Sequence, residues 1–418
     1  MNKQTYYSLN PWWENRDFET GIFRPLYLNH FLKRLKRRQI EIIIGSRRVG
    51  KTTLLKQIIK KLLEQKIKRE KILYVSCDFA KAIGIPISAH LNFFRQLFTH
   101  SKGEKLYLFL DEVQESPDWQ IELKSLYDND NLKIFCSGST SALIKTHGEK
   151  LTGRQINTVV YPLNFKEFLN FKQVKLNYSE GYLLEKKAEE YLQIGGYPEN
   201  VLVPSEEYLA SLLEDIFLRD LVRLYPVKNL RAIKNLLKLV AASVSSRVSF
   251  NKLSNVLGIS LDTAKDYLVH LEDAFLVKKL NKWSPSYSEK TYALKKIYLV
   301  DNGFKTLLTG RGDWGAKAEN AVFWQLNKIH GDNLGYFAES QKEVDFIAGS
   351  FSKPQLFEIK YTDSLDKLKS GLSGLRLFLK RYPKVKKAQV ITKSLDKKVQ
   401  FTKAQLELIP LWRFLLEA

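Results

Sequence analysis

A strand, a glycine-rich turn and a helix follow one another in residues 40–56, IEIIIGSRRVGKTTLLK, and no other stretch constrains the fold as strongly. Gly45 and Gly50 frame the pattern GxxxxGK[ST], in which the loop N–H groups surround phosphates. In this pattern Lys51 reaches the terminal phosphates, and Thr52 offers its hydroxyl to Mg²⁺. The positive end of the following helix faces the same anion. The segment predicts an ATP site formed by Gly45, Ser46, Arg47, Arg48, Val49, Gly50, Lys51, Thr52 and Thr53.

The composition is that of a folded protein with several domains. The chain has 418 residues, of which 44% are hydrophobic and 12% aromatic. It contains no apolar run of about 18 residues and no apolar signal core near its start, so we expect a cytoplasmic protein without a membrane span. Two cysteines and six scattered histidines argue against a disulfide framework and a structural zinc.

The charge balance is strongly basic. A formal net charge of +22 and a pI near 9.6 favour association with polyanions. Nucleic acid, DNA first, is therefore the expected partner, and a lysine-rich solvated surface is the alternative.

Carboxylates end a second apolar strand, LYLFLDEVQ, at residues 106–114. The carboxyl ends of buried parallel strands are where such sheets place ligands, so Asp111 is expected to hold Mg²⁺ and Glu112 to polarise the attacking water. Ser137, at the end of a strand in 131–140, is a candidate for the γ-phosphate or the water. Arg154 is either a charge stabiliser for the transition state or part of a surface ion pair.

Residues 164–240 have helical patterns and predict a lid or linker. Residues 250–280 then predict a helix-turn-helix, followed by an alternating hairpin at 278–300. Asp262, Thr263, Lys265 and Asp266 begin the second helix, and two acids there suit the DNA major groove poorly. A protein contact through this region is the alternative to DNA binding.

The last third of the chain predicts a second acidic site. Asp345 and the triplet Glu358-Ile359-Lys360 lie on neighbouring predicted strands, whose alternation brings both acids and Lys360 to one face. These carboxylates, with Glu319 on a preceding helix, could share Mg²⁺ for phosphodiester attack. The alternative is an inert sheet edge with paired charges. The following sequence predicts an amphipathic helix over 362–381, a strand over 388–393 and a tail. Basic residues in and after this helix suit a phosphate backbone: Lys367, Lys369, Lys380, Arg381, Lys384, Lys386 and Lys387.

The chain resembles the archaeal and bacterial AAA-type ATPases that carry a winged helix and a C-terminal nuclease-like domain. The resemblance lies in these segments: NPWW, GSRRVGKTTLL, LFLDEVQ, GSTS, LTGR, YLVDNGF, AEN, EVDF and FEIKY. The resemblance implies ATPase roles for Lys51, Thr52, Asp111, Glu112 and Arg154, and a parallel sheet of order 5-1-4-3-2. It also implies a restriction-endonuclease-like PD-(D/E)XK fold, with Asp345, Glu358 and Lys360 at its core and Glu319 as its leading acid. Val344 stands where that pattern has proline.

The expected α/β chain therefore has five parts. They are an arm (1–25) whose aromatic residues are expected to hold it to the first domain, a P-loop ATPase core (26–163), a helical lid (164–240), a winged helix (241–300) and a nuclease-like domain (301–418). We expect ATP hydrolysis coupled to DNA and to a Mg²⁺-dependent nuclease. The alternatives are a non-nucleolytic ATP-dependent switch or adaptor that binds a protein partner, and an ATP-responsive transcription regulator. A homo-oligomer is a further possible assembly.

Overall fold

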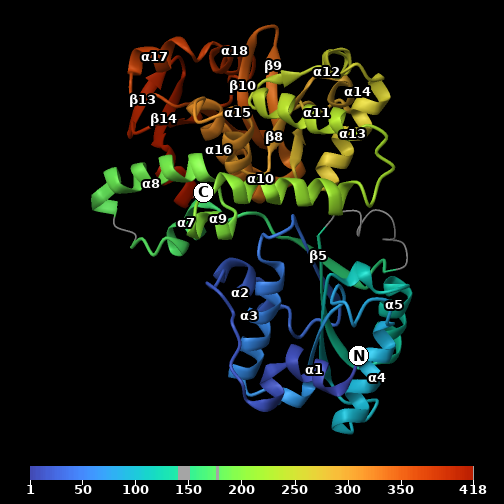
Figure 1. The fold of residues 1–418 in the computed structure, drawn as a ribbon. Helices are drawn as coiled ribbons and strands as arrows, with labels where there is room; N and C mark the ends of the chain where they lie inside the picture. Colours follow the sequence, from blue (N-terminus) through green and yellow to red (C-terminus); the bar gives the residue numbers. More distant parts are fainter. Residues whose placement is uncertain (140–150, 176–177, 418) are drawn as a thin grey trace. The chain divides into compact units, whose positions relative to one another are not determined.

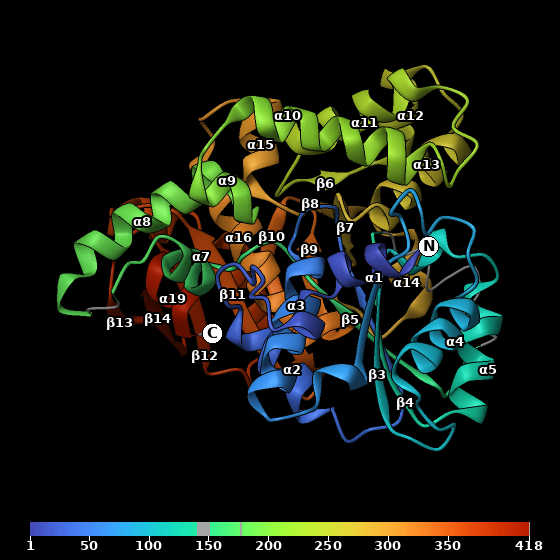
Figure 2. The same ribbon diagram turned by 60° about the horizontal axis from the view of Figure 1, so that its bottom comes forward.

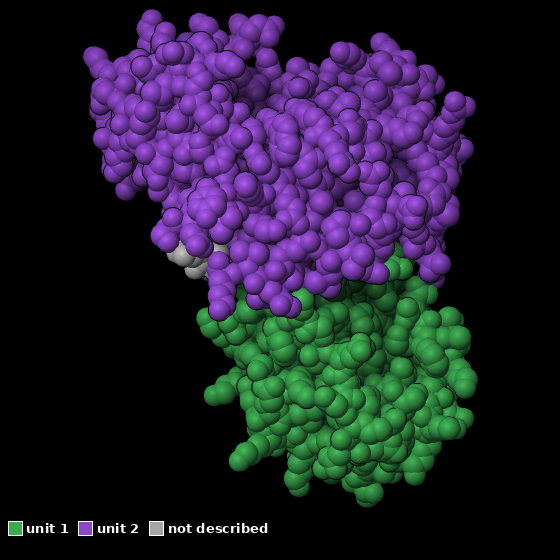
Figure 3. All heavy atoms as spheres, turned by 60° about the vertical axis from the view of Figure 1, so that its left-hand side comes forward, with its two compact units in different colours: residues 1–161 green, residues 162–418 purple. Residues whose placement is uncertain are grey.

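The structure is a computed structural model that describes residues 1–139, 151–175 and 178–417. Contacts within the chain define two compact units, Met1–Tyr161 and Pro162–Ala418 (Figure 3). The predicted arm is part of unit 1, and the three parts predicted after residue 163 form one compact unit. Thr140 and Ser141 of the GSTS segment lie outside the described residues. In the described ranges, no helix is long and apolar enough to cross a bilayer.

Unit 1 alternates strands and helices around one sheet (Figure 1). Its strands are β1 (Ile40–Ile44), β2 (Ile72–Ser76), β3 (Leu106–Asp111), β4 (Leu132–Gly138) and β5 (Gln155–Val159). Its helices are α1 (Lys3–Leu9), α2 (Pro25–Lys33), α3 (Lys51–Glu64), α4 (Ile87–Phe98) and α5 (Trp119–Asn129), with short 3-10 turns at Pro11–Glu14, Arg69–Lys71 and Val113–Glu115.

The unit 1 sheet is parallel throughout and has the strand order β2-β3-β4-β1-β5, which confirms the predicted order. Four of its strands, β1 to β4, are mostly apolar and almost fully buried, as a sheet covered on both faces requires. The rings of Phe109 and Phe135 stack at 5.0 Å on the neighbouring strands β3 and β4.

The N-terminal segment is held against this sheet by its aromatic residues, as predicted. The indole N–H groups of Trp12 and Trp13 both donate to the backbone carbonyl of Ile72, at 3.2 and 2.9 Å. The segment also forms helix α1, which the sequence interpretation did not include.

Unit 2 begins with helices. They are α7 (Phe165–Phe171), a 3-10 turn (Tyr178–Glu180), α8 (Gly181–Ile194), α9 (Pro198–Leu202), α10 (Glu206–Asp215) with a π-helical extension (Ile216–Leu221), and α11 (Leu230–Ala242). The Arg219 side chain pairs with Asp215 at 3.3 Å, one helical turn away, and Asp220 is buried. Arg219 therefore makes a local ion pair within its helix, as its spacing favours.

A helix-turn-helix and a hairpin follow, and α11, α12 and α13 lie side by side (Figures 1 and 2). The elements are β6 (Arg247–Val248), α12 (Phe250–Leu257), α13 (Leu261–Asp273), β7 (Val277–Leu280), α14 (Tyr287–Tyr292) and β8 (Lys295–Leu299). Gly258 ends α12 in the left-handed conformation. The antiparallel sheet has the order β6-β8-β7, and its hairpin loop contains helix α14 where only an extended hairpin was predicted.

The C-terminal part is a six-stranded mixed sheet with helices. Its elements are α15 (Asn302–Thr309), α16 (Trp314–His330), a 3-10 turn (Gly331–Asn333), β9 (Leu334–Glu339), β10 (Lys342–Ser350), β11 (Lys353–Lys360), α17 (Leu365–Ser370), α18 (Ser373–Arg381), β12 (Lys387–Thr392), β13 (Lys397–Phe401), β14 (Ala404–Pro410) and α19 (Leu411–Glu417). The sheet order is β13-β14-β12-β11-β10-β9. The segment that follows β7 bonds to β9 of this sheet, because Trp283 N–H donates to the Tyr336 carbonyl at 2.7 Å.

Two predictions about this region were wrong in detail. The single helix expected over 362–381 is two helices, because Gly371 ends α17 and packs so closely that a Cβ there would lie 2.8 Å from Lys360 Cε. The segment expected to be a tail forms β13, β14 and α19. Its alternation of polar and apolar residues in AQLELIP is the strand signal that was missed.

Candidate functional site

The glycine-rich loop of unit 1 joins the end of β1 to the start of α3, as predicted. Gly45 has a φ of +155°, and a Cβ there would lie only 2.2 Å from the Val160 carbonyl oxygen. Gly50 has a φ of +98° and precedes the first residue of α3. Glycine is therefore required at position 45 by the close approach of the segment after β5, and at position 50 by the left-handed backbone.

Lys51 lies over this loop and is buried. Its ammonium donates to the carbonyl oxygens of Gly45 and Ser46 at 3.0 and 3.1 Å. It also lies 3.9 Å from Glu112 Oε1, at the end of β3. The lysine thus connects the loop to the acids that follow the neighbouring strand.

Asp111 is the centre of a hydrogen-bond network at the carboxyl edge of the sheet. Its Oδ2 accepts hydrogen bonds from the Thr52 hydroxyl at 2.6 Å and the Tyr74 hydroxyl at 2.9 Å. Its Oδ1 accepts one from the Ser137 hydroxyl. Burial raises the pKa of Asp111, and the hydrogen bonds from Ser137 and Thr52 oppose that rise. Burial and the Asp111 charge raise the pKa of Tyr74, so this phenol stays a donor.

Glu112 has a left-handed backbone, with a φ of +50°. Its N–H donates to the Ser137 hydroxyl at 3.0 Å, and Gln114 Nε2 donates to its Oε2 at 2.6 Å. Ser137 therefore contacts both predicted carboxylates. The strained backbone turns the chain immediately after the Asp111 carboxylate.

The other predicted loop residues line the same turn. Ser46 and Val49 are buried, Arg47 and Thr53 are half-buried, and Arg48 is exposed with a φ of +61°. The sequence interpretation missed Arg24, a buried side chain that donates to the Val49 carbonyl at 2.8 Å and the Tyr161 carbonyl at 3.0 Å. It also missed Tyr74. Neither residue belongs to a local pattern, because both reach the site from other segments of the chain.

Arg154 lies at the amino-terminal ends of the parallel strands, whereas the glycine-rich loop follows the carboxyl-terminal end of β1. Register pairs Ile40 with Gln155, so Arg154 precedes the amino-terminal end of β5. Strand β1 rises about 3.3 Å per residue, so its length separates Arg154 from the loop after Ile44. The Arg154 guanidinium pairs with Asp128 at 2.9 and 3.2 Å. The structure thus contains the alternative, a surface ion pair, and places Arg154 away from its own loop. A role of Arg154 as a charge stabiliser at the site of a neighbouring copy stays a prediction.

The acids predicted in the last third come together in unit 2. We call the following residues the acidic cluster: Glu319, Glu343, Asp345 and Glu358. Asp345 N–H donates to Glu358 Oε2 at 3.3 Å, and Ile359 N–H donates to Asp345 Oδ2 at 2.9 Å. Lys360 Nζ lies 2.7 Å from Glu358 Oε1. The strand pairing inferred from alternation is therefore confirmed.

A second lysine, Lys296 of β8, lies inside the acidic cluster and was not predicted. Its side chain is 0% exposed, and its Nζ lies 2.9 Å from Glu319, 2.5 Å from Glu343 and 3.2 Å from Asp345. The nearby Tyr298 hydroxyl donates to Glu319 Oε1 at 2.7 Å. The only sequence signal is a polar pair, KK, at the start of an otherwise apolar strand.

These contacts shift the pKa values of the cluster. Burial and the Asp345 charge raise the pKa of Glu358 to about 8 and that of Glu319 to about 7. Burial alone would lower the pKa of Lys296, but Glu319 and the other surrounding oxygens raise it above its ordinary value. Lys296 therefore carries its positive charge at neutral pH.

The two acidic sites differ in their fitness for a metal. In the parts of the chain that the structure describes, no group of three or more His, Cys, Asp and Glu side chains is placed to hold a metal ion. The expected Mg²⁺ ligands Glu319, Asp345 and Glu358 instead face lysines and backbone N–H groups. In unit 1, the Thr52 hydroxyl and the Asp111 carboxylate are oxygen donors of the kind that Mg²⁺ binds, and they lie 2.6 Å apart. The residues of unit 1 therefore fit Mg²⁺, whereas those of the acidic cluster do not.

The residues expected to face DNA have mixed surroundings. On α13, Asp262 and Lys265 pair with each other at 3.2 Å and are exposed. The basic residues predicted after 366 lie on α17, on α18, in the connection to β12 and at the first residue of β12. Beside the β7–β8 hairpin, a pocket of about 280 Å³ has lysines and aromatic rings in its wall, among them Lys278, Lys279, Lys282, Lys290, Tyr287 and Phe351.

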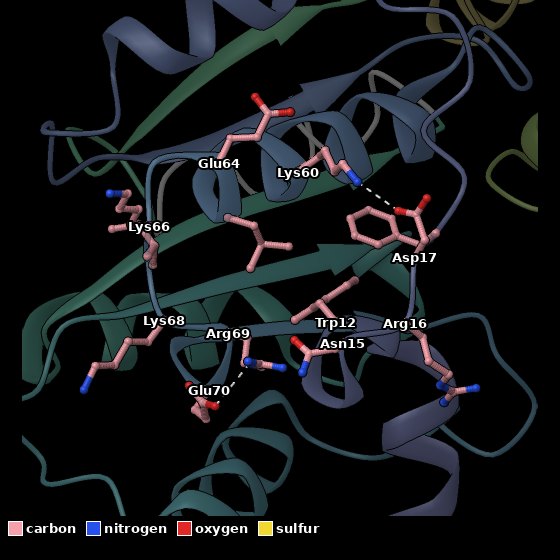
Figure 4. A pocket seen from close by; sticks show the side chains of 13 residues that line it. Trp12, Asn15, Arg16, Asp17, Lys60, Glu64, Lys66, Lys68, Arg69 and Glu70 are labelled. Carbon is pink, nitrogen blue, oxygen red and sulfur yellow. Dashed lines mark hydrogen bonds and ion pairs between the residues drawn. The ribbon is translucent and has the colours of Figure 1, made fainter.

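A larger groove, of about 830 Å³, lies at the other end of α3 from Lys51 (Figure 4). Trp12, Asn15, Lys66, Lys68 and other residues line it. Two ion pairs lie among its lining residues, with Lys60 Nζ 2.8 Å from Asp17 and Arg69 Nε 3.5 Å from its neighbour Glu70. None of the nine predicted ATP-loop residues lines this groove, so it is separate from the glycine-rich loop.

Comparison with protein families places an AAA domain at residues 37–169 and a domain of unknown function, DUF8612, at residues 185–314. The uncharacterized protein MJ1544 of Methanocaldococcus jannaschii is 33% identical over 340 residues, which cover 77% of this chain and 75% of the relative. An uncharacterized protein of Haemophilus influenzae is 30% identical over 338 residues, covering 78% and 84%.

Among solved structures, a Walker-type ATPase of Pyrococcus abyssi aligns with a TM-score of 0.46 and 16% identity, covering 69% of this chain and 96% of that one. The AMPPCP-bound DnaA of Aquifex aeolicus aligns with a TM-score of 0.28 and 20% identity, covering 63% and 92%.

Proposed function

Since the chain belongs to the family of these archaeal and bacterial relatives and carries an AAA domain, we propose that it binds ATP at the glycine-rich loop and hydrolyses it. The observation that carries the proposal is the 2.6 Å hydrogen bond between Thr52 and Asp111. It brings the hydroxyl of the loop and the carboxylate of the neighbouring strand to one point, as phosphoryl transfer requires.

The loop residues bind the phosphates in this proposal. Backbone N–H groups of residues 45–53 and the amino-terminal end of α3 face the anion. Lys51, which now bonds the carbonyls of Gly45 and Ser46, exchanges those partners for the terminal phosphates. Its burial strengthens this charge interaction, because little water competes for the ammonium.

Thr52 and Asp111 would hold Mg²⁺, which supplies charge neutralisation at the transferred phosphoryl group. Glu112 polarises the attacking water as general base. Ser137 positions both carboxylates, since its hydroxyl contacts Asp111 and the backbone of Glu112. Arg154 has no part in hydrolysis at its own loop.

Substitutions of Thr52 test this assignment. Thr52→Ala removes the hydroxyl, so we expect loss of most Mg²⁺-dependent phosphate release from ATP. Thr52→Ser keeps the hydroxyl and should retain activity. Equal hydrolysis by Thr52→Ala and wild type would contradict the proposal.

DNA association is a second candidate function, and the pocket beside the hairpin favours it. The order α11, β6, α12, α13, β7, β8 supports a winged helix. Tyr287 is 84% exposed and lines the pocket with four lysines, two of which pair with acids: Lys279 with Glu272 and Lys282 with Glu289. Lys278 and Lys290 remain for phosphates, and the exposed ring suits an unstacked base. We therefore propose that the hairpin, rather than α13, contacts DNA.

Charge reversal separates these two surfaces. We expect Lys278→Glu with Lys290→Glu to weaken the binding of single-stranded DNA and to reduce its salt dependence, measured by fluorescence anisotropy. Lys265→Glu on α13 is the matched control and should bind as wild type does. Weaker binding by the control alone would assign the contact to α13.

For the output of the ATPase, we propose a non-nucleolytic switch, in which nucleotide state changes how unit 2 engages DNA, a protein partner or a second copy of the chain. The β9–β12 region with α16 supports a PD-(D/E)XK-like fold, but its acids are already paired with lysines. A transcription regulator is the variant of this proposal in which the winged helix alone acts on DNA. Salt-dependent DNA binding that survives removal of residues 301–418 would favour that variant.

A further inference from the structure

The acidic cluster of unit 2 contains its own cation. Lys296 Nζ lies within 3.2 Å of oxygens of Glu319, Glu343 and Asp345, and the lysine is fully buried. These three acids come from α16 and β10, whereas Lys296 comes from β8. An ammonium with three carboxylates around it occupies the centre of the cluster.

The position of Lys296 is fixed by the fold. Strand β8 is the middle strand of the three-stranded sheet β6-β8-β7. Tyr298, two residues further along the same face of β8, stacks on Phe323 of α16 and donates to Glu319. Moving the ammonium out of the cluster would therefore require moving either the lysine stem through buried side chains or the strand itself.

Other carboxylate oxygens of the cluster also have partners. Asp345 Oδ2 accepts from the Ile359 N–H, and the two oxygens of Glu358 receive Lys360 and the Asp345 N–H. Glu343 also lies 3.1 Å from Arg247 Nε, so all four acids of the cluster contact cationic side chains of the chain itself. A buried cluster of this kind loses stability when one partner is removed, because the opposite charge is then left uncompensated.

We propose that the Lys296 ammonium takes the place of a divalent cation in the acidic cluster, so that this cluster does not bind Mg²⁺ or Mn²⁺ and does not cleave phosphodiesters. A metal ion there would have to lie beside a like charge or displace it. Lys296 instead fastens the hairpin sheet to the C-terminal sheet. This inference rests on the switch proposed for unit 2, and it does not depend on ATP hydrolysis in unit 1.

Binding of Mn²⁺ to the full chain tests the inference, measured from the electron paramagnetic resonance of free Mn²⁺ without nucleotide. All proteins carry Asp111→Asn, which removes the metal ligand in unit 1. We expect this parent and its Asp345→Asn derivative to bind equally little Mn²⁺. Binding by the parent that Asp345→Asn abolishes would overturn the inference.

Removal of the internal cation gives the complementary measurement. Lys296→Met is expected to create one Mn²⁺ site that Lys296→Met with Asp345→Asn lacks. Thermal unfolding shows whether each variant is folded, and a folded Lys296→Met protein without the new site would contradict the inference. Lys296→Arg keeps the charge and should gain no site. If Lys296→Met does not fold, the comparison of Mn²⁺ binding between the parent and its Asp345→Asn derivative still tests the inference.

The ATPase is tested separately, with proteins that keep Asp111. ATP hydrolysis by the otherwise unchanged chain reports on unit 1 alone. If this chain does not hydrolyse ATP, the ATPase proposal is contradicted and the Mn²⁺ result is unaffected.

Discussion

The hydroxyl of Thr52 lies 2.6 Å from Oδ2 of Asp111, so the first turn of α3 is bonded to the end of β3. Tyr74 and Ser137 donate to the same carboxylate from β2 and β4. Three strands and one helix thereby converge on one buried acid. The arrangement fixes the position of the carboxylate relative to the glycine-rich loop before any ligand binds.

Asp111→Asn should keep the shape of this side chain and remove its charge. We expect ATP hydrolysis to fall by roughly a hundredfold or more, since one preorganised charged group contributes that order of rate enhancement. The rate measured against Mg²⁺ concentration should show a weaker dependence than in wild type. Asp118→Asn, an exposed acid in the loop after β3, is the control and should behave as wild type does. An unchanged Mg²⁺ profile in Asp111→Asn would contradict the assignment.

Glu112→Gln should separate binding from hydrolysis. The amide can accept a hydrogen bond but is a poor base, so turnover should fall by about 10²–10⁴-fold. Affinity for a fluorescent ATP analogue should remain close to that of wild type. Parallel loss of binding and turnover would mean that Glu112 contributes to ATP binding rather than to the hydrolytic step.

Arg154→Ala should leave hydrolysis by a dilute, monomeric chain within about twofold of wild type, because an exposed ion pair such as Arg154–Asp128 contributes little. Initial rates at several protein concentrations check this. A tenfold loss at the lowest concentration would contradict the placement of Arg154. A loss that appears only as the chain associates would show that Arg154 acts on a neighbouring copy.

Asp301 should make the stability of unit 2 depend on pH. Burial raises its pKa from 3.8 to about 6, although the N–H groups of Gly196 and Gly303 oppose that rise. The folded chain therefore holds this proton more tightly than the unfolded chain. The stabilisation from Asp301 is complete below about pH 3.8 and is lost as the pH rises to about 6.

Denaturant unfolding of wild type and Asp301→Asn between pH 4 and 7 measures this contribution of Asp301 to the free energy of unfolding. The stability of wild type relative to the variant should fall by on the order of 3 kcal/mol across that range. A constant difference between the two proteins would show that Asp301 has an ordinary pKa in the fold.

Most of unit 1 could be predicted from the sequence because its signals are local. The strand, the glycine turn and Lys51-Thr52 are contiguous, and a parallel sheet places Asp111 at the same edge as the loop. Arg154 was considered for this site because the local pattern does not tell at which edge of the sheet the start of β5 lies. That depends on the direction of the strand relative to β1.

The acidic cluster was predicted only in part, for a related reason. Asp345, Glu358 and Lys360 follow from strand alternation, but Lys296 reaches them from a strand 49 residues before Asp345. No periodicity in the sequence reports that contact. The helix in the hairpin loop was also missed, since YSEKTY has only six residues and is too short for a helical pattern.

ATP hydrolysis by Lys51→Ala compared with wild type tests the central claim most directly. Both proteins are given ATP and Mg²⁺, and phosphate release is followed, with Lys60→Ala on the same helix as the control. We predict steady release by wild type and Lys60→Ala and loss of release in Lys51→Ala, because Lys51 is the cation at the loop. Equal release by Lys51→Ala and wild type would contradict the account.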